Sequence, residues 1–272
     1  MTLSPADLAA YRARIGWNGE AQAGRATLET LVAHHTRTFA FENLDPLTGR
    51  VPDLTLPGLV TKLVHQGRGG YCYEQNGLFK AVLESVGFDV TGHAARVMWN
   101  LPEDVPTGRT HMVLRVDLPE GPAIADVGFG SQTLTGVLDL VDGVEQATPH
   151  GPFRLLRQGD VWRQEVSVLG EWRPVYAYDL QPQLPIDYEL ANWWSATSPR
   201  SHFLTGLIVA RATPGRRSVL RNFDLTIHHV DGPSERRRLE SPAETCDVIE
   251  TLFDIHIPDR AALEHRLEEI AG

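Results

Sequence analysis

The sequence predicts an α+β protein of several subdomains, because its residue pattern changes twice along the chain. Up to about residue 90, apolar residues recur at the three- and four-residue spacing of amphipathic helices. From about 90 to 180, short runs rich in Val, Thr and aromatic residues alternate with Gly, Pro and Asp, as in strands. Beyond Pro185 both patterns occur. We therefore expect a helical part, a β part and a mixed part, in that order.

The helices of the first part are indicated by start and stop residues as well as by spacing. Ser4 followed by Pro5 is typical of a helix start, and Gly16 ends that run. The glycine-rich turn of residues 67–70 precedes a buried helix that begins at Cys72 and stops at Gly87. Helices are expected over residues 4–15, 24–38, 57–65 and 72–86.

The later elements follow from the same reasoning. Strands are expected over residues 90–100, 110–118, 123–129, 151–157, 161–168, 171–180, 203–213 and 223–230. Helices are expected over residues 189–199, 244–253 and 260–272. The chain has no internal repeat.

Composition and charge limit the classes of function. The chain has 272 residues, of which 42% are hydrophobic, so it has ample material for a folded core. Its 25 Lys+Arg and 35 Asp+Glu leave a net charge of -10, which opposes general binding to nucleic acid or an anionic membrane. We expect neither partner, so a polyanion would need a local site. A homo-oligomer stays open.

Cysteine usage indicates the redox compartment. Cys72 and Cys246 are the two cysteines, and no CxxC or zinc-type spacing occurs, so we expect neither a disulfide nor a metal. The N-terminus has no apolar run of signal length, and no window approaches ~18 apolar residues. The expected localisation is cytoplasmic.

Cys72 is a candidate nucleophile because it follows a glycine-rich turn at the start of a helix. There the free N–H groups and the helix dipole stabilise a thiolate. Three glycines just before Cys72 allow the backbone to approach a ligand closely. The alternative is that Cys72 is a small buried apolar residue.

His111 and Asp126 are expected to lie near each other on paired strands. Residues 118–121 read as a tight turn, and if Leu118 closes on Gly121, then Asp126 falls opposite Val113. His111 lies two residues from Val113 on the same, more polar face, within diagonal reach of Asp126. Taken alone, His111 is more often polar surface and Asp126 a turn residue.

Together, Cys72, His111 and Asp126 supply a thiol, a base and an orienting carboxylate, the groups needed for acyl transfer through a thioester. The candidate donors to the developing oxyanion are the backbone amides of Cys72 and Tyr73.

Several motifs resemble the arylamine N-acetyltransferases: RGGYCYEQNGL with Cys72, THMVL with His111 and ADVGFG with Asp126, and also FAFENLDPLTGR and SHFLTG. The resemblance covers most of the chain. It implies an N-terminal helical domain, a central β-barrel and a C-terminal α/β lid around a papain- or transglutaminase-like Cys-His-Asp core. The implied boundaries are 1–90, 91–184, 185–204 for an interdomain helical segment, and 205–272.

The resemblance also implies the reaction. Acetyl-CoA would acetylate Cys72, with His111 as base and Asp126 orienting the imidazole. An arylamine, arylhydrazine or N-hydroxyarylamine would then take the acetyl group, with acetyl-CoA as co-substrate and no metal.

Pocket residues are expected around these groups. Gly128 and Gly130 expose bare backbone beside the Phe129 ring, and Phe39 and Phe41 are candidates for the wall of a flat apolar slot. The resemblance places the substrate at Phe39, Phe41, Tyr71, Val97, Phe129 and Phe203. It places CoA at Thr110, Gly128, Phe129, Gly130, Ser131 and Phe203.

Three alternatives stay open. A related amide synthase would close a macrolactam from a carrier-bound acyl chain, and a thiol hydrolase would pass the acyl group to water. A CoA- or aromatic-binding protein would use Cys72, His111 and Asp126 only structurally.

Tyr73 and Gln75 depart from the family pattern, which leaves substrate preference open. Arg236–Arg238 read as a solvated strand face, and Cys246 as a packing residue.

Overall fold

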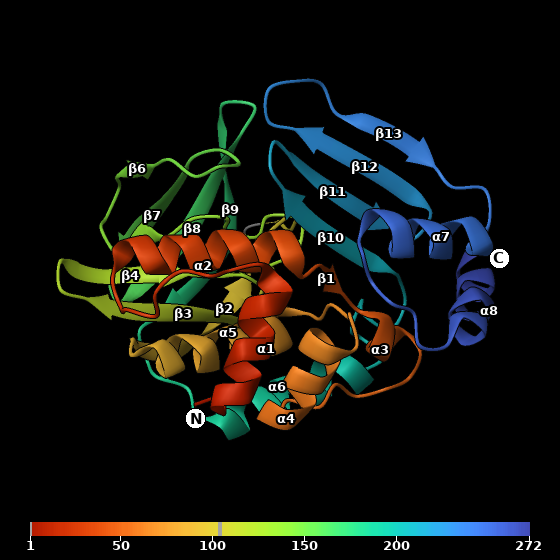
Figure 1. The fold of residues 1–272 in the computed structure, drawn as a ribbon. Coiled ribbons are helices and arrows are strands. Elements are labelled where there is room, and N and C mark those ends of the chain that lie inside the picture. The colour runs from red at the N-terminus through yellow and green to blue at the C-terminus, as the bar shows by residue number, and fades with distance from the viewer. Residues whose placement is uncertain (1, 103–104) are drawn as a thin grey trace.

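The computed structural model describes residues 2–102 and 105–272. Figure 1 shows the N-terminal helices at the centre and lower part of the molecule, an eight-stranded sheet beside them, and a five-stranded sheet on the other side with two helices at the C-terminal end. This is the α+β architecture that the sequence predicts.

The N-terminal helices begin and end as their sequence signals predict. The Ser4 hydroxyl accepts the Asp7 N–H at 3.1 Å, and Gly16 ends the first helix with a φ of 66°. The helix expected over 57–65 is instead a short α-helix followed by a π-helix, in which the Gln66 N–H bonds to the Thr61 carbonyl. The helices are α1 (Pro5–Ile15), α2 (Arg25–Thr38), α3 (Leu44–Leu47), α4 (Leu56–Leu59), η1 (Val60–His65) and α5 (Cys72–Val86).

The eight-stranded sheet is antiparallel and nearly closes into a barrel. Its order is β5-β4-β3-β2-β9-β8-β7-β6. Across the two edge strands, the Asp139 N–H donates to Gln146 Oε1 at 2.7 Å, and Gln146 Nε2 donates to the Asp139 carbonyl at 3.0 Å. The strands are β2 (Asp89–Val97), β3 (His111–Leu118), β4 (Gly121–Ala125), β5 (Leu138–Asp139), β6 (Glu145–Gln146), β7 (Phe153–Gln158), β8 (Val161–Val168) and β9 (Glu171–Asp179).

The five-stranded sheet joins both ends of the chain, because β1 from the N-terminal part pairs with β10. The strand expected from Phe203 begins only at Ile208, since the preceding residues form turns such as Gly206 N–H to the His202 carbonyl. Strand β11 was not predicted, because its arginines break the apolar pattern. The strands are β1 (Phe41–Glu42), β10 (Ile208–Thr213), β11 (Arg216–Arg221), β12 (Asp224–His229) and β13 (Glu235–Arg238).

Three further helices cover the later part of the chain: α6 (Pro185–Thr197), α7 (Pro242–Leu252) and α8 (Arg260–Ala271). Helices α7 and α8 share a core with the five-stranded sheet, and Cys246 is buried in it, as expected of a packing residue. A second core joins α1, α2 and α5 to one face of β2–β4, and a third fills the barrel. Throughout the described ranges, no helix combines the length and apolarity needed to cross a membrane. The four segment boundaries stay a prediction.

We expect Leu78→Ala to lower the free energy of unfolding by about 2–5 kcal/mol, because it leaves a cavity beneath α5. Leu78 is 0% exposed, whereas Leu190 on α6 is 63% exposed, so Leu190→Ala is the matched control. Urea unfolding checks both variants. Equal losses in the two variants would contradict the assigned core.

Candidate active site

Cys72 is the first residue of helix α5 and is buried. The turn before it requires glycine, because a Cβ on Gly69 would lie 2.1 Å from the Ala40 carbonyl oxygen. The Cys72 and Tyr73 amides occupy the first two helical positions, which have no acceptor within the helix. These amides are free to face a ligand, and their oxyanion role stays a prediction.

His111 and Asp126 meet as the turn geometry predicts. Leu118 pairs with Gly121, and the register continues to Leu114 opposite Ala125, so Asp126 leaves β4 just beyond the paired residues. His111 Nε2 lies 2.7 Å from Asp126 Oδ2, and both side chains are buried. The pair therefore forms a short, water-excluded contact.

Electrostatics favour the charged form of this pair. Burial lowers the pKa of His111, but the charge and hydrogen bond of Asp126 and the hydrogen bond with Cys72 raise it to about 10. Burial raises the pKa of Asp126, yet His111, Asn76 and the Gly128 amide together lower it. An imidazolium beside a carboxylate is the arrangement that stabilises a neighbouring thiolate.

The loop that follows Asp126 packs closely against Cys72. A Cβ on Gly128 would lie 2.8 Å from the Cys72 Cα, so only glycine allows this approach. The Cys72 thiol lies 3.7 Å from the Thr110 carbonyl oxygen, next to His111. The structure thus brings the predicted thiol, imidazole and carboxylate together, although their catalytic roles stay a prediction.

Asn76 is a site residue that the sequence analysis missed. Its Nδ2 donates to Asp126 Oδ1 at 2.9 Å and to the Met112 carbonyl at 2.8 Å, and its Oδ1 accepts the Val127 N–H at 3.0 Å. Asn76 therefore ties α5 to β3 and to the Asp126 loop. Its position four residues after Cys72, on the same face of α5, is a signal that could have found it.

Aromatic rings enclose the His111 imidazole. The Phe129 ring meets it edge-on at a centroid distance of 5.1 Å, and the Tyr176 ring lies 4.8 Å away. The face that carries His111 and Val113, which the sequence marks as the more polar one, is buried at these residues because it points into the barrel core. The missed Tyr176 comes from β9, which no local pattern links to β3.

The remaining predicted pocket residues fall into separate groups. Phe203 contacts Phe41 and Tyr71, at centroid distances of 6.1 and 5.5 Å, and Tyr71 in turn contacts Tyr73. Phe39 instead packs against Tyr11 and His35 in the helical core. Ser131 and Val97 are half-buried, with Val97 opposite Tyr176 in the register of β2 and β9. Their contacts with substrate or CoA stay predictions.

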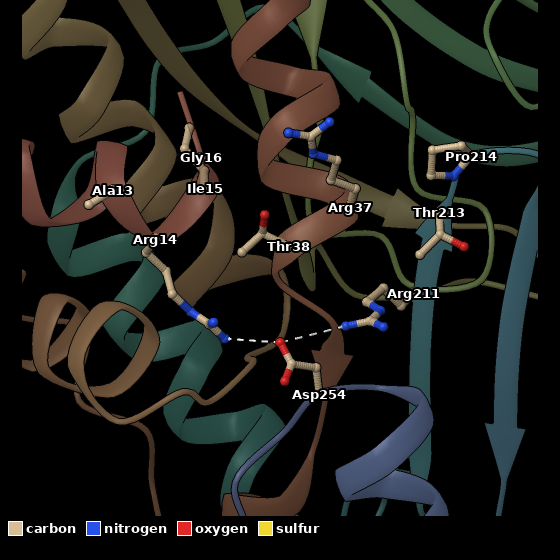
Figure 2. Close-up of a pocket in the computed structure, with 10 residues that line it drawn as sticks. All are labelled: Ala13, Arg14, Ile15, Gly16, Arg37, Thr38, Arg211, Thr213, Pro214 and Asp254. Atoms are coloured by element: carbon tan, nitrogen blue, oxygen red, sulfur yellow. Dashed lines mark hydrogen bonds and ion pairs between the residues drawn. The ribbon is translucent and has the colours of Figure 1, made fainter. Parts of the chain in front are cut away.

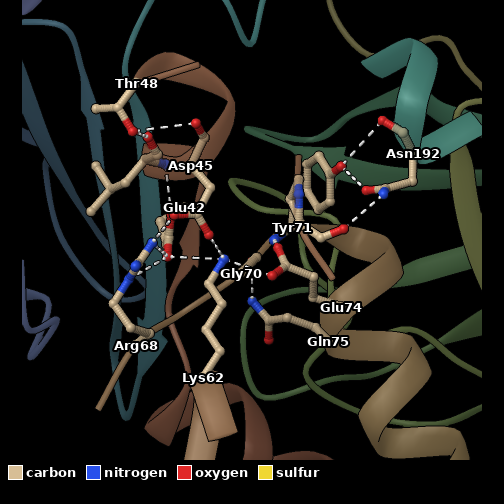
Figure 3. Close-up of polar contacts among 12 residues, drawn as sticks. Glu42, Asp45, Thr48, Lys62, Arg68, Gly70, Tyr71, Glu74, Gln75 and Asn192 are labelled. Carbon is tan, nitrogen blue, oxygen red and sulfur yellow. Dashed lines mark hydrogen bonds and ion pairs between the residues drawn. The ribbon is translucent and has the colours of Figure 1, made fainter. Parts of the chain in front are cut away.

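A buried cluster of charges lies behind the start of α5 (Figure 3). Lys62 Nζ lies 2.6 Å from both Glu74 and Asp45, and the Arg68 guanidinium lies 2.8 Å from Glu42. Glu74 also accepts the Tyr71 N–H at 3.0 Å, which caps the helix that carries Cys72. Three carboxylates thus face two cations, which leaves one surplus negative charge in the protein interior.

A proton on Glu74 would relieve this surplus charge. Burial raises the pKa of Glu74, Lys62 opposes this rise, and the charges of Glu42 and Asp45 raise it further, to about 7. When Glu74 is neutral, the two remaining carboxylates balance the two cations.

The other side of the same helix start is fixed by α6. Tyr71 Oη donates to Asn192 Oδ1, and Asn192 Nδ2 donates to the Pro52 carbonyl at 3.0 Å (Figure 3). Tyr71, the residue before Cys72, is therefore held by two bonds: its N–H donates to Glu74, and its hydroxyl donates to Asn192.

A surface cavity of about 440 Å³ lies elsewhere (Figure 2). Arg14 and Arg211 reach Asp254 from two sides, at 3.4 and 4.0 Å. None of Cys72, His111 and Asp126 lines it. Within the described parts of the chain, no group of three or more His, Cys, Asp or Glu side chains is arranged to hold a metal ion.

The fold and the site define a class of multi-domain α+β proteins that bring a cysteine, a histidine and an aspartate together beside a nearly closed eight-stranded sheet. Residues 26–262 match the model of the N-acetyltransferase family. The arylamine N-acetyltransferase of Mycolicibacterium smegmatis is 43% identical over 270 residues, which cover 97% of this chain and 98% of the relative. That of Escherichia coli K12 is 42% identical over 251 residues, covering 92% and 89%.

A solved structure agrees with these relatives. The arylamine N-acetyltransferase of Mycobacterium marinum in complex with CoA has a TM-score of 0.93 and 39% identity, covering 97% of this chain and 99% of that one. The chain belongs to the arylamine N-acetyltransferase family.

We expect the Glu74 proton to make stability depend on pH. A carboxyl whose folded-state pKa is raised from 4.5 to about 7 stabilises the fold below pH 4.5, and this contribution is lost as the pH rises through 7. Between pH 5 and 8, the wild type should lose about 2–3 kcal/mol of unfolding free energy relative to Glu74→Gln. Urea unfolding at each pH measures this difference.

Glu120→Gln in the exposed β3–β4 turn is the control, and it should follow the wild type at every pH. Parallel pH profiles for the wild type and Glu74→Gln would show that Glu74 carries no proton in this range.

Proposed function

We propose that this protein transfers an acetyl group from acetyl-CoA to aromatic amines, hydrazines or N-hydroxyarylamines through a thioester on Cys72. The observation that carries the proposal is the buried His111–Asp126 pair at 2.7 Å, next to a cysteine that begins a helix. Family membership supports the same reaction. Relatives carry the names arylamine N-acetyltransferase and N-hydroxyarylamine O-acetyltransferase.

The first half-reaction forms the acetyl-enzyme. The Cys72 thiolate attacks the carbonyl carbon of acetyl-CoA, and the amides of Cys72 and Tyr73 donate to the developing oxyanion. The bond between the acetyl carbon and the CoA sulfur then breaks. Since His111 Nε2 bonds to Asp126, its Nδ1 is available to give its proton to the departing CoA thiolate.

The second half-reaction restores the starting state. The amine nitrogen attacks the acetyl carbon while the neutral His111 takes one amine proton, and the bond to the Cys72 sulfur breaks. Cys72 leaves as a thiolate and His111 is again an imidazolium, so protons balance over the cycle. Asp126 stabilises this imidazolium and orients the ring.

We place the acetyl-CoA and acceptor sites around Phe129, next to the His111–Asp126 pair. The bare backbone of Gly128–Ser131, with Thr110 and Phe203, would hold CoA, and a solved relative contains CoA. The acceptor ring would lie against Phe129, Phe41, Tyr71 and Val97, with Phe39 behind them. The edge-on contact of Phe129 with His111 supports this placement, because it puts the Phe129 ring beside the proposed base.

The proposed setting is the cytoplasm, where a free thiol persists, and both cysteines are free. Whether the protein forms a homo-oligomer stays an open question, and light scattering on the purified protein measures the mass that answers it.

Incubation with acetyl-CoA alone should place one acetyl group on the peptide that contains Cys72, detected by mass spectrometry, and an added arylamine should remove it. Cys72→Ser should lose the adduct with its fold intact. Cys246→Ser is the matched control, because Cys246 is also buried but packs in the C-terminal core, and it should be acetylated normally.

An unmodified Cys72 during turnover overturns the proposal. Acetylation only from a carrier-bound thioester would indicate an amide synthase, and loss of the acetyl group to water regardless of arylamine would indicate a hydrolase.

Asp126→Asn should lower kcat for acetyl transfer by about 10²–10⁴-fold, because the neutral amide no longer stabilises the imidazolium. Steady-state kinetics at saturating acetyl-CoA measure this loss. Asp160→Asn, at an exposed turn, is the control and should keep wild-type kcat. A similar kcat in both variants would remove Asp126 from the mechanism.

A further inference from the structure

Arg217 is a buried arginine of the five-stranded sheet. It lies on the central strand β11 of the five-stranded sheet and is 6% exposed. Among residues 2–102 and 105–272, no carboxylate forms an ion pair with it, and its Nη2 is buried without a hydrogen-bond partner. Burial lowers the pKa of Arg217 to about 10. An isolated buried cation is costly, so a purely structural role explains it poorly.

Within the described residues, the Arg217 guanidinium forms one hydrogen bond, and it reaches the loop beside the active site. Arg217 Nη1 donates to the Thr133 carbonyl at 2.8 Å, and Thr133 itself is buried. Thr133 lies seven residues after Asp126, beyond the Gly128–Gly130 segment. A strand of the C-terminal sheet is therefore bonded to the loop that leaves the His111–Asp126 pair.

His150 forms a second tether between the same two parts. Its Nδ1 lies 2.9 Å from the Thr135 hydroxyl, and its Nε2 lies 2.8 Å from the Thr213 carbonyl. A carbonyl only accepts, so Nε2 carries the proton and Nδ1 accepts from Thr135. Burial and then the charge of Arg217 lower the pKa of His150, which keeps this neutral arrangement.

A tight turn of residues 130–133 connects Thr133 to Phe129, whose ring contacts His111. The Thr133 N–H bonds to the Gly130 carbonyl at 3.1 Å, and the Gly130 N–H donates to the Thr133 hydroxyl at 2.7 Å. Gly130 has a φ of 91°, and a Cβ at this position would lie 3.3 Å from the Phe41 ring. Phe129, the preceding residue, covers the His111 imidazole. Movement of Thr133 would therefore move the ring that shields His111 from water.

We propose that Arg217, supported by His150, is a positioning residue that holds the 128–135 loop so that Phe129 stays against His111. The role of His111 in this statement rests on the proposed function. In this arrangement the five-stranded sheet holds the loop through the bond from Arg217 to the Thr133 main-chain carbonyl. The loop in turn fixes how His111 lies relative to Cys72. The guanidinium suits this task because its planar donors are held in fixed directions.

The test measures the reactivity of Cys72 directly. In a Cys246→Ser background, iodoacetamide alkylation at pH 6 reports the ion-paired thiolate, because an ordinary thiol is almost fully protonated there. Arg217→Met should slow alkylation and lower kcat/KM for acetyl transfer by about tenfold or more. Its Tm should stay within about 4 °C of wild type, since it also removes a buried charge that no carboxylate of the described residues pairs with.

Two further variants separate positioning from packing. Arg217→Lys keeps a donor for the Thr133 carbonyl and should recover most of the alkylation rate. Thr135→Val removes the hydroxyl bonded to His150 with little change of shape and should slow alkylation by less than Arg217→Met does. Arg236→Met, an exposed arginine on β13 of the same sheet, should match the wild type.

Wild-type alkylation and kcat/KM in Arg217→Met overturn the proposal, and so does a loss that Arg217→Lys fails to recover while remaining folded by circular dichroism. A wild type that acetyl-CoA fails to acetylate overturns the proposed function instead, because the alkylation assay needs neither CoA nor amine.

Discussion

The Gly70 backbone, two residues before Cys72, joins the start of helix α5 to the five-stranded sheet. Its N–H donates to the Ala40 carbonyl at 3.2 Å, and its carbonyl accepts from the Glu42 N–H and from Gln75 Nε2. Through Ala40 and Glu42 it is bonded to β1 and hence to the five-stranded sheet, and through Gln75 to α5. Because glycine alone fits this turn, the start of α5 and the thiol on it are held in one position relative to the five-stranded sheet.

Buried charge is concentrated around that position. The His111–Asp126 pair, the Lys62 and Arg68 cluster and Arg217 all lie in the interior, where electrostatic interactions are strong and an uncompensated charge is costly. Each group holds a different element beside the Cys72 thiol. Asp126 holds the imidazole, the Lys62 and Arg68 cluster holds the start of α5, and we propose that Arg217 holds the loop after Asp126. Stability is given up for a defined geometry, which is common at sites that must hold reacting groups in place.

Much of the site follows from short stretches of sequence. Cys72 follows a glycine-rich turn, and the register of His111 and Asp126 follows from a four-residue turn, because a strand side chain alternates faces with a fixed period. Asn76, Tyr176 and Arg217 were not identified. Asn76 had a local signal in its helical spacing, whereas the other two come from strands whose partners are far along the chain, and single-chain periodicity does not encode such pairings.

The sequence alone specified the order of helical and β parts, the helix caps and the thiol, imidazole and carboxylate, since each depends on residues close together in the chain. Its apolar periodicity left open which strand faces would be buried, and the polar appearance of the His111 face was misleading for that reason. Closure of the barrel buried this face against Tyr176, and pairing of β1 with β10 brought the C-terminal sheet to the site. Burial and long-range pairing are collective properties of the packed chain, so they appear only when all the elements are in place.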